Sequence, residues 1–322
     1  MCGIYGCLNF DNKIVDTKTL NNLSNGMIHR GPDNQGFLID KNFGFGMRRL
    51  SIIDLDGGNQ PIFNETKNLS IVFNGEIYNY KEIKDKLIQK GHVFQTEGDT
   101  EVIIHLFEEK GIDCVNDLNG EFSFAIWDKI KRQLYIARDR FGVKPLYWYQ
   151  NNKSFYFSSD LLALNRIIGE KVSKTSILNY LIYSYVPAPQ SIFKNIFKLE
   201  PGHNLTIKNN KVEKRKYWNL NKKKINKSVI EIKNEIDYLL KDSIKLRLNS
   251  DVPLGIMLSG GIDSSTIALY ASKELDNISS YTIKYIDKEE KDSISGHFVA
   301  EKFKLNHNEY EFFSKNEISS ID

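Results

Sequence analysis

Residues 1–7 read MCGIYGC and place a cysteine at the second position of the chain. Removal of Met1 would leave Cys2 with a thiol and a free α-amine on one residue. The ordinary pKa values, about 8.5 for a thiol and about 7.7–8.0 for an α-amine, lie close to neutral pH. An N-terminal nucleophile can then use its own α-amine as general base. Taken alone, however, a small second residue without any role is the simpler interpretation.

The composition is that of an ordinary globular chain. The 322 residues are 41% hydrophobic and carry 44 basic against 41 acidic side chains, a length and balance that suggest two domains. A net charge of +3 gives no large basic field, so nucleic acid is not favoured as a partner. No apolar run reaches 18 residues, so we expect no membrane span and no secretory signal.

Cysteine usage indicates the compartment. The three cysteines, Cys2, Cys7 and Cys114, show no metal-like spacing, and the sequence singles out no metal ligands. Three cysteines also argue against a disulfide framework and for a reducing setting. We interpret Cys7 and Cys114 as inert core residues and expect the protein in the cytoplasm.

Hydrophobic periodicity divides the chain in two. The first part alternates short helices with strands, including 71–73 and a run of antiparallel strands over 122–127, 133–137, 146–149 and 154–157. A polar stretch rich in Lys and Asn, 208–227, is the expected linker. After it, strand 254–258, a glycine-rich turn, a helix and strand 280–285 form a βαβ pattern, which predicts a parallel sheet with covered faces.

Three short motifs in the first part carry groups suited to an amino acid whose side-chain carbonyl is attacked. Asn74-Gly75-Glu76 follows a strand, where a side-chain amide beside an unhindered backbone N–H makes an oxyanion hole. Arg49 offers a guanidinium for a carboxylate. Asp99, at a helix start, is suited to hold an ammonium, and a plain helix cap is the alternative.

Together these motifs resemble a known family. MCGIYG, HRGPD (29–33), RLSI (49–52), FNGEIYN (73–79) and RDRFG (138–142) resemble the class II, N-terminal-nucleophile glutamine amidotransferases over residues 1–205. The resemblance implies a four-layer α/β/β/α sandwich, over 1–207, in which Cys2 attacks the glutamine carboxamide.

The same resemblance implies roles for individual residues. Asn74 and Gly75 would stabilise the oxyanion, Arg49 would hold the α-carboxylate of glutamine, and Asp99 its α-ammonium. The implied glutamine-binding residues are Arg49, Leu50, Ser51, Ile52, Ile53, Asn74, Gly75, Glu76 and Asp99.

The second part carries the motif SGGIDSS (259–265) between a strand and a helix. Its backbone N–H groups and hydroxyls can cradle phosphate oxygens at the helix N-terminus, although a plain glycine-serine turn is the alternative. It lacks the GK[ST] ending of a Walker loop. With DVP (251–253) before it, the motif resembles the pyrophosphate loop of ATP-pyrophosphatase enzymes, specifically glutamine-hydrolysing asparagine synthetases. YVPAP (185–189) and LEPGH (199–203) resemble the joining region of that family.

This second resemblance implies how the ammonia released from glutamine would be used. In that family ATP activates the aspartate β-carboxylate as an acyl-adenylate, Mg²⁺ accompanies the leaving pyrophosphate, and ammonia then gives asparagine. Glutamine, aspartate and ATP are the implied small-molecule substrates, and a homodimeric assembly stays open. The implied ATP-binding residues are Met257, Ser259, Gly260, Gly261, Asp263, Ser264, Ser265 and Ile283, with Met257 and Ile283 beside the adenine.

The sequence departs from the family pattern at two points. Ser159-Asp160 stands where family members usually carry Ser-Glu, which leaves the role of Asp160 open. We also expect 228–322 to be an incomplete N-terminal part of the synthetase domain, because the family's downstream serine-glycine-acid loop has no counterpart before Asp322. The alternatives are a synthetase-like amidotransferase for another carboxylate and a glutaminase-only or regulatory fragment.

Overall fold

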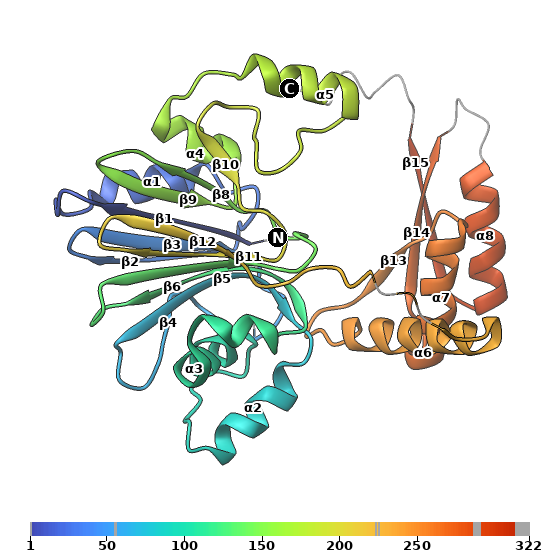
Figure 1. Ribbon diagram of the computed structural model, residues 1–322. Coiled ribbons are helices and arrows are strands. Elements are labelled where there is room, and N and C mark those ends of the chain that lie inside the picture. The colour runs from blue at the N-terminus through green and yellow to red at the C-terminus, as the bar shows by residue number, and fades with distance from the viewer. Residues whose placement is uncertain (1, 55–56, 223, 225, 286–290, 313–322) are drawn as a thin grey trace. The chain divides into compact units, whose positions relative to one another are not determined.

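The computed structural model describes residues 2–54, 57–222, 224, 226–285 and 291–312 (Figure 1). The chain divides into two compact units, Met1–Lys222 and Lys223–Asp322. We call them the first and second unit and describe each by itself.

The first unit is built on two six-stranded antiparallel sheets. The first sheet has the order β10-β8-β9-β1-β3-β2, and the second has the order β12-β11-β7-β6-β5-β4. The first sheet comprises β1 (Gly3–Asn9), β2 (Asn34–Asp40), β3 (Phe43–Arg49), β8 (Tyr147–Gln150), β9 (Ser154–Ser158) and β10 (Ile196–Lys198). The second comprises β4 (Ile62–Phe63), β5 (Leu69–Ile77), β6 (Gly120–Asp128), β7 (Gln133–Arg138), β11 (His203–Lys208) and β12 (Lys211–Lys216). The run of strands expected from 122 to 157 is therefore shared between the two sheets.

Helices cover the outer face of each sheet (Figure 1). Helices α1 (Thr17–Asn25) and α4 (Leu161–Ile168) pack on the first sheet, and α2 (Tyr80–Gln89), α3 (Thr100–Lys110) and the 3₁₀ helix η1 (Gly111–Asn116) lie on the side of the second. Helix α5 (Lys174–Tyr183) follows α4. Buried side chains form three clusters, one between the sheets and one beneath each helix layer. The predicted four-layer α/β/β/α sandwich is confirmed.

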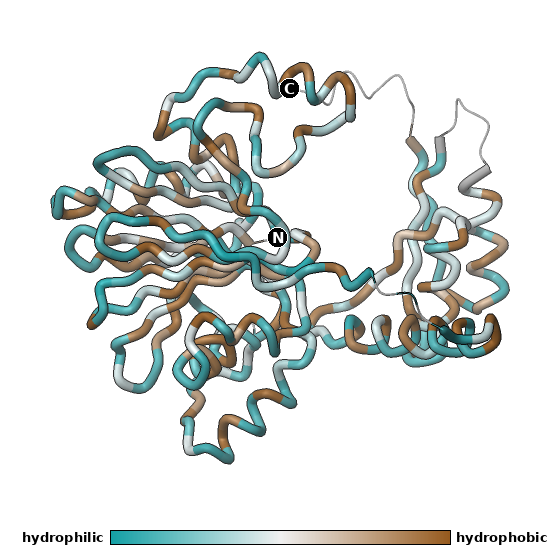
Figure 2. Tube along the Cα trace, in the orientation of Figure 1, coloured by the Kyte–Doolittle hydropathy of each residue, from teal (hydrophilic) through white to brown (hydrophobic). Residues whose placement is uncertain are grey.

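Aromatic packing joins the two sheets. The ring of Trp127, from β6, stacks on that of Phe43, from β3, with centroids 4.1 Å apart. The indole Nε1 donates a hydrogen bond of 2.8 Å to Asp40 Oδ2, so the buried ring leaves no unpaired donor. Such a pair contributes about 0.5–1.5 kcal/mol beyond its burial. In Figure 2 hydrophobic positions recur along the stacked strands, as alternation on a sheet with a buried face requires.

Strand β5 differs from the sequence expectation. It does not end before Asn74 but continues to Ile77, with Asn74 paired to Ser123 and Gly75 paired to Phe122. A β-carbon at Gly75 would lie 2.2 Å from the Glu121 carbonyl oxygen, so the absence of a side chain allows the two strands to pair closely. The Asn74-Gly75-Glu76 motif is therefore held by a sheet and not by a loop.

The predicted linker 208–227 is wrong in its first half. Residues Lys211–Lys216 form strand β12 at the edge of the second sheet, in register with β11. Edge strands often carry lysines, which discourage pairing with other chains. The strand therefore has the same composition as a solvated linker, and composition alone does not distinguish the two.

The second unit has a three-stranded parallel sheet of order β13-β14-β15, with bounds Gly255–Met257, Ser279–Tyr285 and Asn306–Phe312. Helices α7 (Ile262–Glu274) and α8 (Lys291–Phe303) connect successive strands. Residues Ile256, Leu258, Ala268, Ala271, Ile278 and Ala300 form its buried core. The βαβ pattern is confirmed and extends to a third strand.

Helix α6 (Val229–Arg247) opens the second unit. Ser228 and Glu231 form a capping box at its start, which satisfies backbone donors of the first turn. Apolar residues recur along α6 at a helical spacing, but Ile236 and Leu239 are about half exposed. Neither α6 nor any other helix in the described ranges combines the length and apolarity needed to cross a bilayer.

Candidate active site

A cavity of about 100 Å³ lies in the first unit where β1 begins and β3 ends. Cys2, Arg49, Leu50, Ile52, Ile53, Asn74, Gly75, Glu76 and Asp99, all predicted, line it. Gly58, Gln60, Ile62, Phe73, Thr96, Gly98, Thr100 and Lys144 line it as well and were not predicted. The structure thus brings the sequence candidates of the first unit into one pocket, with one exception.

That exception is Ser51, which does not line the cavity. Its backbone N–H donates to Asp33 Oδ2 at 2.8 Å, so the HRGPD motif holds the segment after β3 in place. Gly31 of the same motif is needed because a β-carbon there would lie 2.3 Å from the carbonyl carbon of Arg48. Ser51 therefore belongs to the support of the pocket.

Cys2 is half-buried at the pocket wall. The backbone N–H of Leu50 donates to its Sγ at 3.3 Å, and Arg30 Nε donates to its carbonyl oxygen at 3.1 Å. Burial raises the pKa of the Cys2 thiol above its ordinary value, although the Leu50 contact and nearby positive charge oppose this. The thiol is therefore protonated at neutral pH and needs a base before it can attack.

Asn74 presents an unused donor. Its side chain is 1% exposed, and its Nδ2 has no hydrogen-bond partner among the described residues. Leaving a buried donor unpaired costs about 1–3 kcal/mol, so such groups call for an explanation. The next residue, Gly75, lines the same cavity. A ligand oxygen in the pocket would supply the missing partner.

Arg49 is buried yet faces the pocket. Its Nη2 donates to the carbonyl oxygen of Ile53 at 3.0 Å and to that of Asp54 at 2.5 Å, and its Nη1 donates to Asn59 Oδ1 at 3.1 Å. These bonds to the segment after β3 fix the guanidinium plane. The geometry provides a positioned positive charge in a small cavity.

Asp99 occupies the N-cap position of α3 but makes no capping hydrogen bond with its side chain. The carboxylate instead accepts a hydrogen bond of 2.8 Å from the backbone N–H of Ile77. Burial raises the pKa of Asp99 to about 7, and the negative charge of Glu76 contributes to the rise. The plain helix-cap interpretation is therefore wrong, and the carboxyl group lines the cavity instead.

The RDRFG motif holds the turn that carries one of the pocket residues. The buried Asp139 carboxylate accepts backbone N–H bonds from Phe122, Phe141, Val143 and Lys144. Arg138 Nε donates to the Lys144 carbonyl oxygen at 2.7 Å. These bonds fix the turn that carries Lys144, a pocket residue with its ammonium 3.4 Å from Glu121 Oε2.

Two of the pocket residues that were not predicted connect its walls. Gln60 Oε1 accepts from the Phe73 backbone N–H at 2.6 Å, and its Nε2 donates to Thr100 Oγ1 at 3.2 Å. Thr100 directly follows Asp99 in the sequence, so its position beside a predicted site residue was a signal that could have identified it. Gln60 has no comparable local signal, because its role depends on strands far away in the sequence.

Asp160 caps a helix. Its Oδ1 accepts from the backbone N–H of Ala163 at 2.8 Å, and its Oδ2 lies 3.3 Å from His29 Nε2. A short acidic side chain suits an N-cap, which explains in this chain why Asp follows Ser159.

In the second unit SGGIDSS forms the turn from β13 into α7. Gly260 has φ +73°, and a β-carbon there would lie 2.3 Å from the Ser295 side chain, so glycine is required twice over. Gly261 occupies the N-cap of α7, where no side chain caps the helix. The hydroxyl of Ser265 is buried and has no partner among the described residues. The turn therefore offers donors to an anion.

The predicted ATP residues fall into two groups. Ser259, Gly260, Gly261, Asp263, Ser264 and Ser265 lie on the turn and the first turn of α7. Met257 and Ile283 lie apart from them in an apolar hollow of about 430 Å³, together with Tyr281, Thr282, Tyr310 and Phe312. A hollow of this kind is suited to a flat apolar ring.

A two-sheet antiparallel sandwich with a cysteine beside its first strand is typical of the N-terminal-nucleophile fold. Comparison with known proteins gives the same class. The model of the glutamine amidotransferase domain family matches residues 1–218, and that of asparagine synthase matches 235–321. A solved B. subtilis structure, glutamine phosphoribosylpyrophosphate amidotransferase with ADP and GMP, matches 95% of this chain and 65% of its own, with TM-score 0.52 and 17% identity.

Relatives place the chain more narrowly. Asparagine synthetase [glutamine-hydrolyzing] 1 of Bacillus subtilis is 36% identical over 88% of this chain and 46% of its own length. A putative asparagine synthetase [glutamine-hydrolyzing] 2 of Methanocaldococcus jannaschii is 37% identical over 100% of this chain and 67% of its own. The chain thus belongs to the glutamine amidotransferase family, in the branch of the glutamine-hydrolysing asparagine synthetases, and spans about half to two thirds of these relatives.

The three cysteines should differ in reactivity. A small alkylating reagent should modify Cys2 and spare Cys7 and Cys114, which are buried and whose thiol pKa values burial raises, that of Cys7 to about 12. Because the Cys2 pKa is also raised, its labelling rate should increase steeply with pH through the alkaline range. Peptide mass spectrometry of the native protein measures this. Equal labelling of Cys7 in the folded chain would contradict the assignment.

Proposed function

We propose that the chain acts as a glutamine-dependent asparagine synthetase, in which the first unit hydrolyses glutamine and the second binds ATP. The unpaired Nδ2 of Asn74 in the same cavity as Cys2 is the observation that carries the first half. A buried donor without a partner suits an oxygen that becomes negative during reaction.

The first step is nucleophilic attack. Once Met1 is removed, the α-amine of Cys2 takes the thiol proton, and the sulfur attacks the carboxamide carbon of glutamine. The proton then passes to the amide nitrogen and the C–N bond breaks. Ammonia leaves, and the glutamyl group remains on Cys2 as a thioester. Water, deprotonated by the same amine, cleaves the thioester to give glutamate and free thiol.

The pocket holds the two ends of the amino acid. The guanidinium of Arg49, fixed by the carbonyl groups of Ile53 and Asp54, pairs with the α-carboxylate. Asp99, once deprotonated, pairs with the α-ammonium. Asn74 Nδ2 and the Gly75 backbone N–H stabilise the oxyanion of the tetrahedral intermediate.

The second unit supplies the site for the acceptor reaction. Backbone donors at the start of α7 and the Ser265 hydroxyl fit the pyrophosphate of ATP, and the hollow with Met257 and Ile283 fits the adenine. Mg²⁺ would accompany the phosphates and neutralise charge on the leaving pyrophosphate. The name of the relatives implies aspartate as the acceptor carboxylate. Ammonia from the first unit would attack the activated aspartate to give asparagine. We propose the cytoplasm as the compartment.

Substitutions should separate chemistry from binding. Cys2→Ala and a form that retains Met1 should release no glutamate from glutamine. Asn74→Ala should lower kcat by about 10²–10³, because it removes an oxyanion donor. Arg49→Ala should raise KM more than it lowers kcat, since its contact with the carboxylate is similar in the ground and transition states. Steady-state assays of glutamate release measure all of these, and the reverse pattern for the last two variants would contradict the pocket assignment.

Glutamine binding should depend on the protonation of Asp99. With a pKa of about 7 before glutamine binds, Asp99 must lose its proton before it can pair with an ammonium. Affinity should therefore be constant above this pKa and fall by about tenfold per pH unit well below it. Calorimetry on the inactive Cys2→Ala variant isolates binding from chemistry. Asp99→Asn is the control and should bind weakly with no such pH dependence, whereas an unchanged pH profile would refute the role.

The Ser265 hydroxyl should contribute to nucleotide binding. Ser265→Ala should weaken binding of Mg-ATP or pyrophosphate by about 10- to 100-fold, the value of a hydrogen bond to a charged group. The hydroxyl bonds to none of the described residues, so the fold should be unaffected. Ser272→Ala, whose hydroxyl bonds to the Leu269 carbonyl oxygen on the same helix, is the matched control. Equilibrium dialysis gives the comparison, and equal affinity in both variants would place the phosphates elsewhere.

A further inference from the structure

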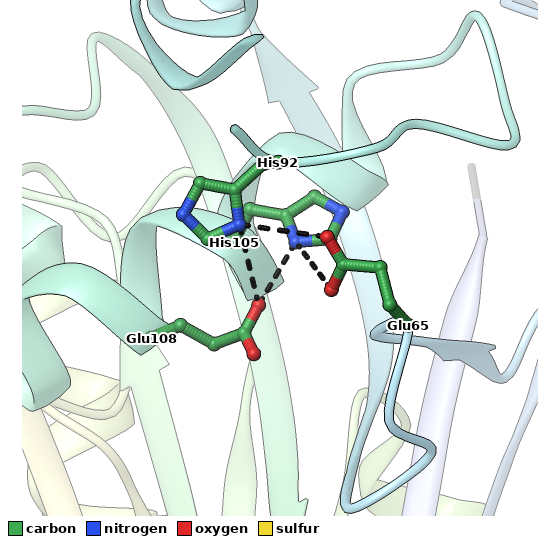
Figure 3. Close-up of side chains that lie close together, drawn as sticks. All are labelled: Glu65, His92, His105 and Glu108. Carbon is green, nitrogen blue, oxygen red and sulfur yellow. Dashed lines mark hydrogen bonds and ion pairs between the residues drawn. The ribbon is translucent and has the colours of Figure 1, made fainter. Parts of the chain in front are cut away.

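A second cluster of chemically active side chains lies in the first unit, formed by Glu65, His92, His105 and Glu108 (Figure 3). The Nδ1 of His105 lies 2.9 Å from Glu108 Oε2 and 3.5 Å from Glu65 Oε2. The Nδ1 of His92 lies 3.6 Å from Glu65 Oε1 and 3.7 Å from Glu108 Oε2. Two imidazole nitrogens and two carboxylates therefore point at one common centre.

Three separate segments contribute to this centre. Glu65 lies in the turn between β4 and β5, His92 in the connection between α2 and α3, and His105 and Glu108 on α3. The helical spacing of i and i+3 places the last two on the same face. The side chain of His105 is 0% exposed and that of His92 13%, whereas Glu65 is 32% exposed and leaves an approach from solvent.

Each histidine is backed by a further carboxylate on its other nitrogen. His92 Nε2 lies 3.3 Å from Glu109 Oε1, and the other oxygen of Glu109 pairs with Lys90. His105 Nε2 lies 3.5 Å from Glu101 Oε1, within ion-pair distance although not in hydrogen-bond geometry. Metal-binding histidines commonly present the second nitrogen to a carboxylate in this way, which leaves the lone pair of the first nitrogen for the metal.

The two carboxylates of the centre are oriented in a similar manner. Glu108 Oε1 accepts a hydrogen bond of 2.7 Å from Asn64 Nδ2, which directs Glu108 Oε2 toward the histidines. The Val93 backbone N–H donates to Glu65 Oε1 at 3.0 Å, which leaves Glu65 Oε2, 3.5 Å from His105 Nδ1, as the oxygen for an ion. Each carboxylate thus has one oxygen held by a neighbour and the other directed at the centre.

We propose that Glu65, His92, His105 and Glu108 bind one Zn²⁺ ion as a structural site. Zinc takes four nitrogen and oxygen ligands in a tetrahedron, and bonds of about 2.0–2.2 Å place neighbouring donors about 3.3–3.6 Å apart. His105 Nδ1 and His92 Nδ1 lie 2.9 Å and 3.7 Å from Glu108 Oε2, and all four donor atoms lie within 4.8 Å of one another, so binding an ion requires only a small inward adjustment of the side chains. Magnesium and calcium prefer six or more oxygen ligands, which a centre with two imidazoles does not supply.

The ion connects the three segments to the wall of the glutamine pocket. Glu101, behind His105, accepts hydrogen bonds from the backbone N–H groups of Gln95 and Thr96. Thr96 lines the pocket, and α3 begins beside Asp99. Zinc on His105 therefore fixes the start of α3 and the segment before it, a positioning role that takes no part in the chemistry at Cys2.

Zinc titration tests the proposal directly. The probe is ZnCl₂, added to the full chain with the Cys2→Ala substitution in competition with a chromophoric chelator and with MgCl₂ in excess. The substitution removes the accessible thiol and makes the readout independent of glutamine hydrolysis. We expect one zinc per chain, with an affinity that rises with pH because the ligands must lose their protons.

Variants assign the ion to its ligands. Loss of a residue that only hydrogen-bonds to a metal ligand weakens metal binding by about 10- to 100-fold. His92→Ala and Glu108→Gln remove ligands themselves and should therefore weaken zinc binding by more than this. His297→Ala is the matched control, because it removes a histidine from the group His297, His307 and Glu309 in the second unit and should leave the affinity unchanged. Circular dichroism without zinc checks that each variant folds, and zinc should raise the unfolding temperature of the parent but not of His92→Ala.

Three outcomes would overturn the proposal. The first is the absence of stoichiometric zinc, in which case protonated histidines paired with carboxylates account for the cluster. The second is full retention of zinc in both His92→Ala and Glu108→Gln. The third is its loss in His297→Ala, which would place the ion in the second unit.

Discussion

The pairing of β1 with both β3 and β9 is the constraint on which the first unit depends. Because β1 begins at residue 3 in the middle of a sheet, Cys2 is held by a backbone ladder although it lies next to the chain terminus. The register sets Gly3 opposite Arg48, so Arg49 and Leu50 necessarily fall beside Cys2. Sheet pairing alone thus brings the thiol of Cys2 and the guanidinium of Arg49 together.

The sequence was sufficient for what depends on local pattern. Alternation located the strands, Asp99 marked the start of α3, and the ordered motifs identified just over half of the residues that line the pocket. It failed where distant segments decide. Nothing local shows that β5 continues past Asn74, because the reason is the close approach of β6 at Gly75. Gln60 reaches the pocket because it bonds to Phe73 and Thr100, which lie far from it in the sequence. The lysine-rich composition of β12 predicted a linker where an edge strand lies.

The histidine cluster could not be predicted from the sequence for the same reason. His105 and Glu108 share a helix face, but His92 and Glu65 reach the centre only because β4, β5 and the α2–α3 connection fold against that helix.

In both units a glycine allows two segments of the chain to approach closely. Gly75 admits a neighbouring strand, and Gly260 admits α8 next to the turn before α7. In each case the absence of a side chain allows two backbone segments to lie close together.

Charge connects the pocket to its ligand. Burial keeps the thiol of Cys2 protonated and brings the pKa of Asp99 close to neutrality, so before a ligand binds neither group carries a full charge at neutral pH. On the proposed function, the ammonium of a zwitterionic amino acid would favour the ionised form of Asp99, which would lose its proton as the ligand binds. Cys2 and Asp99 would therefore avoid the cost of a buried charge until a ligand enters, whereas Arg49 keeps its charge and is held by the carbonyl groups of Ile53 and Asp54.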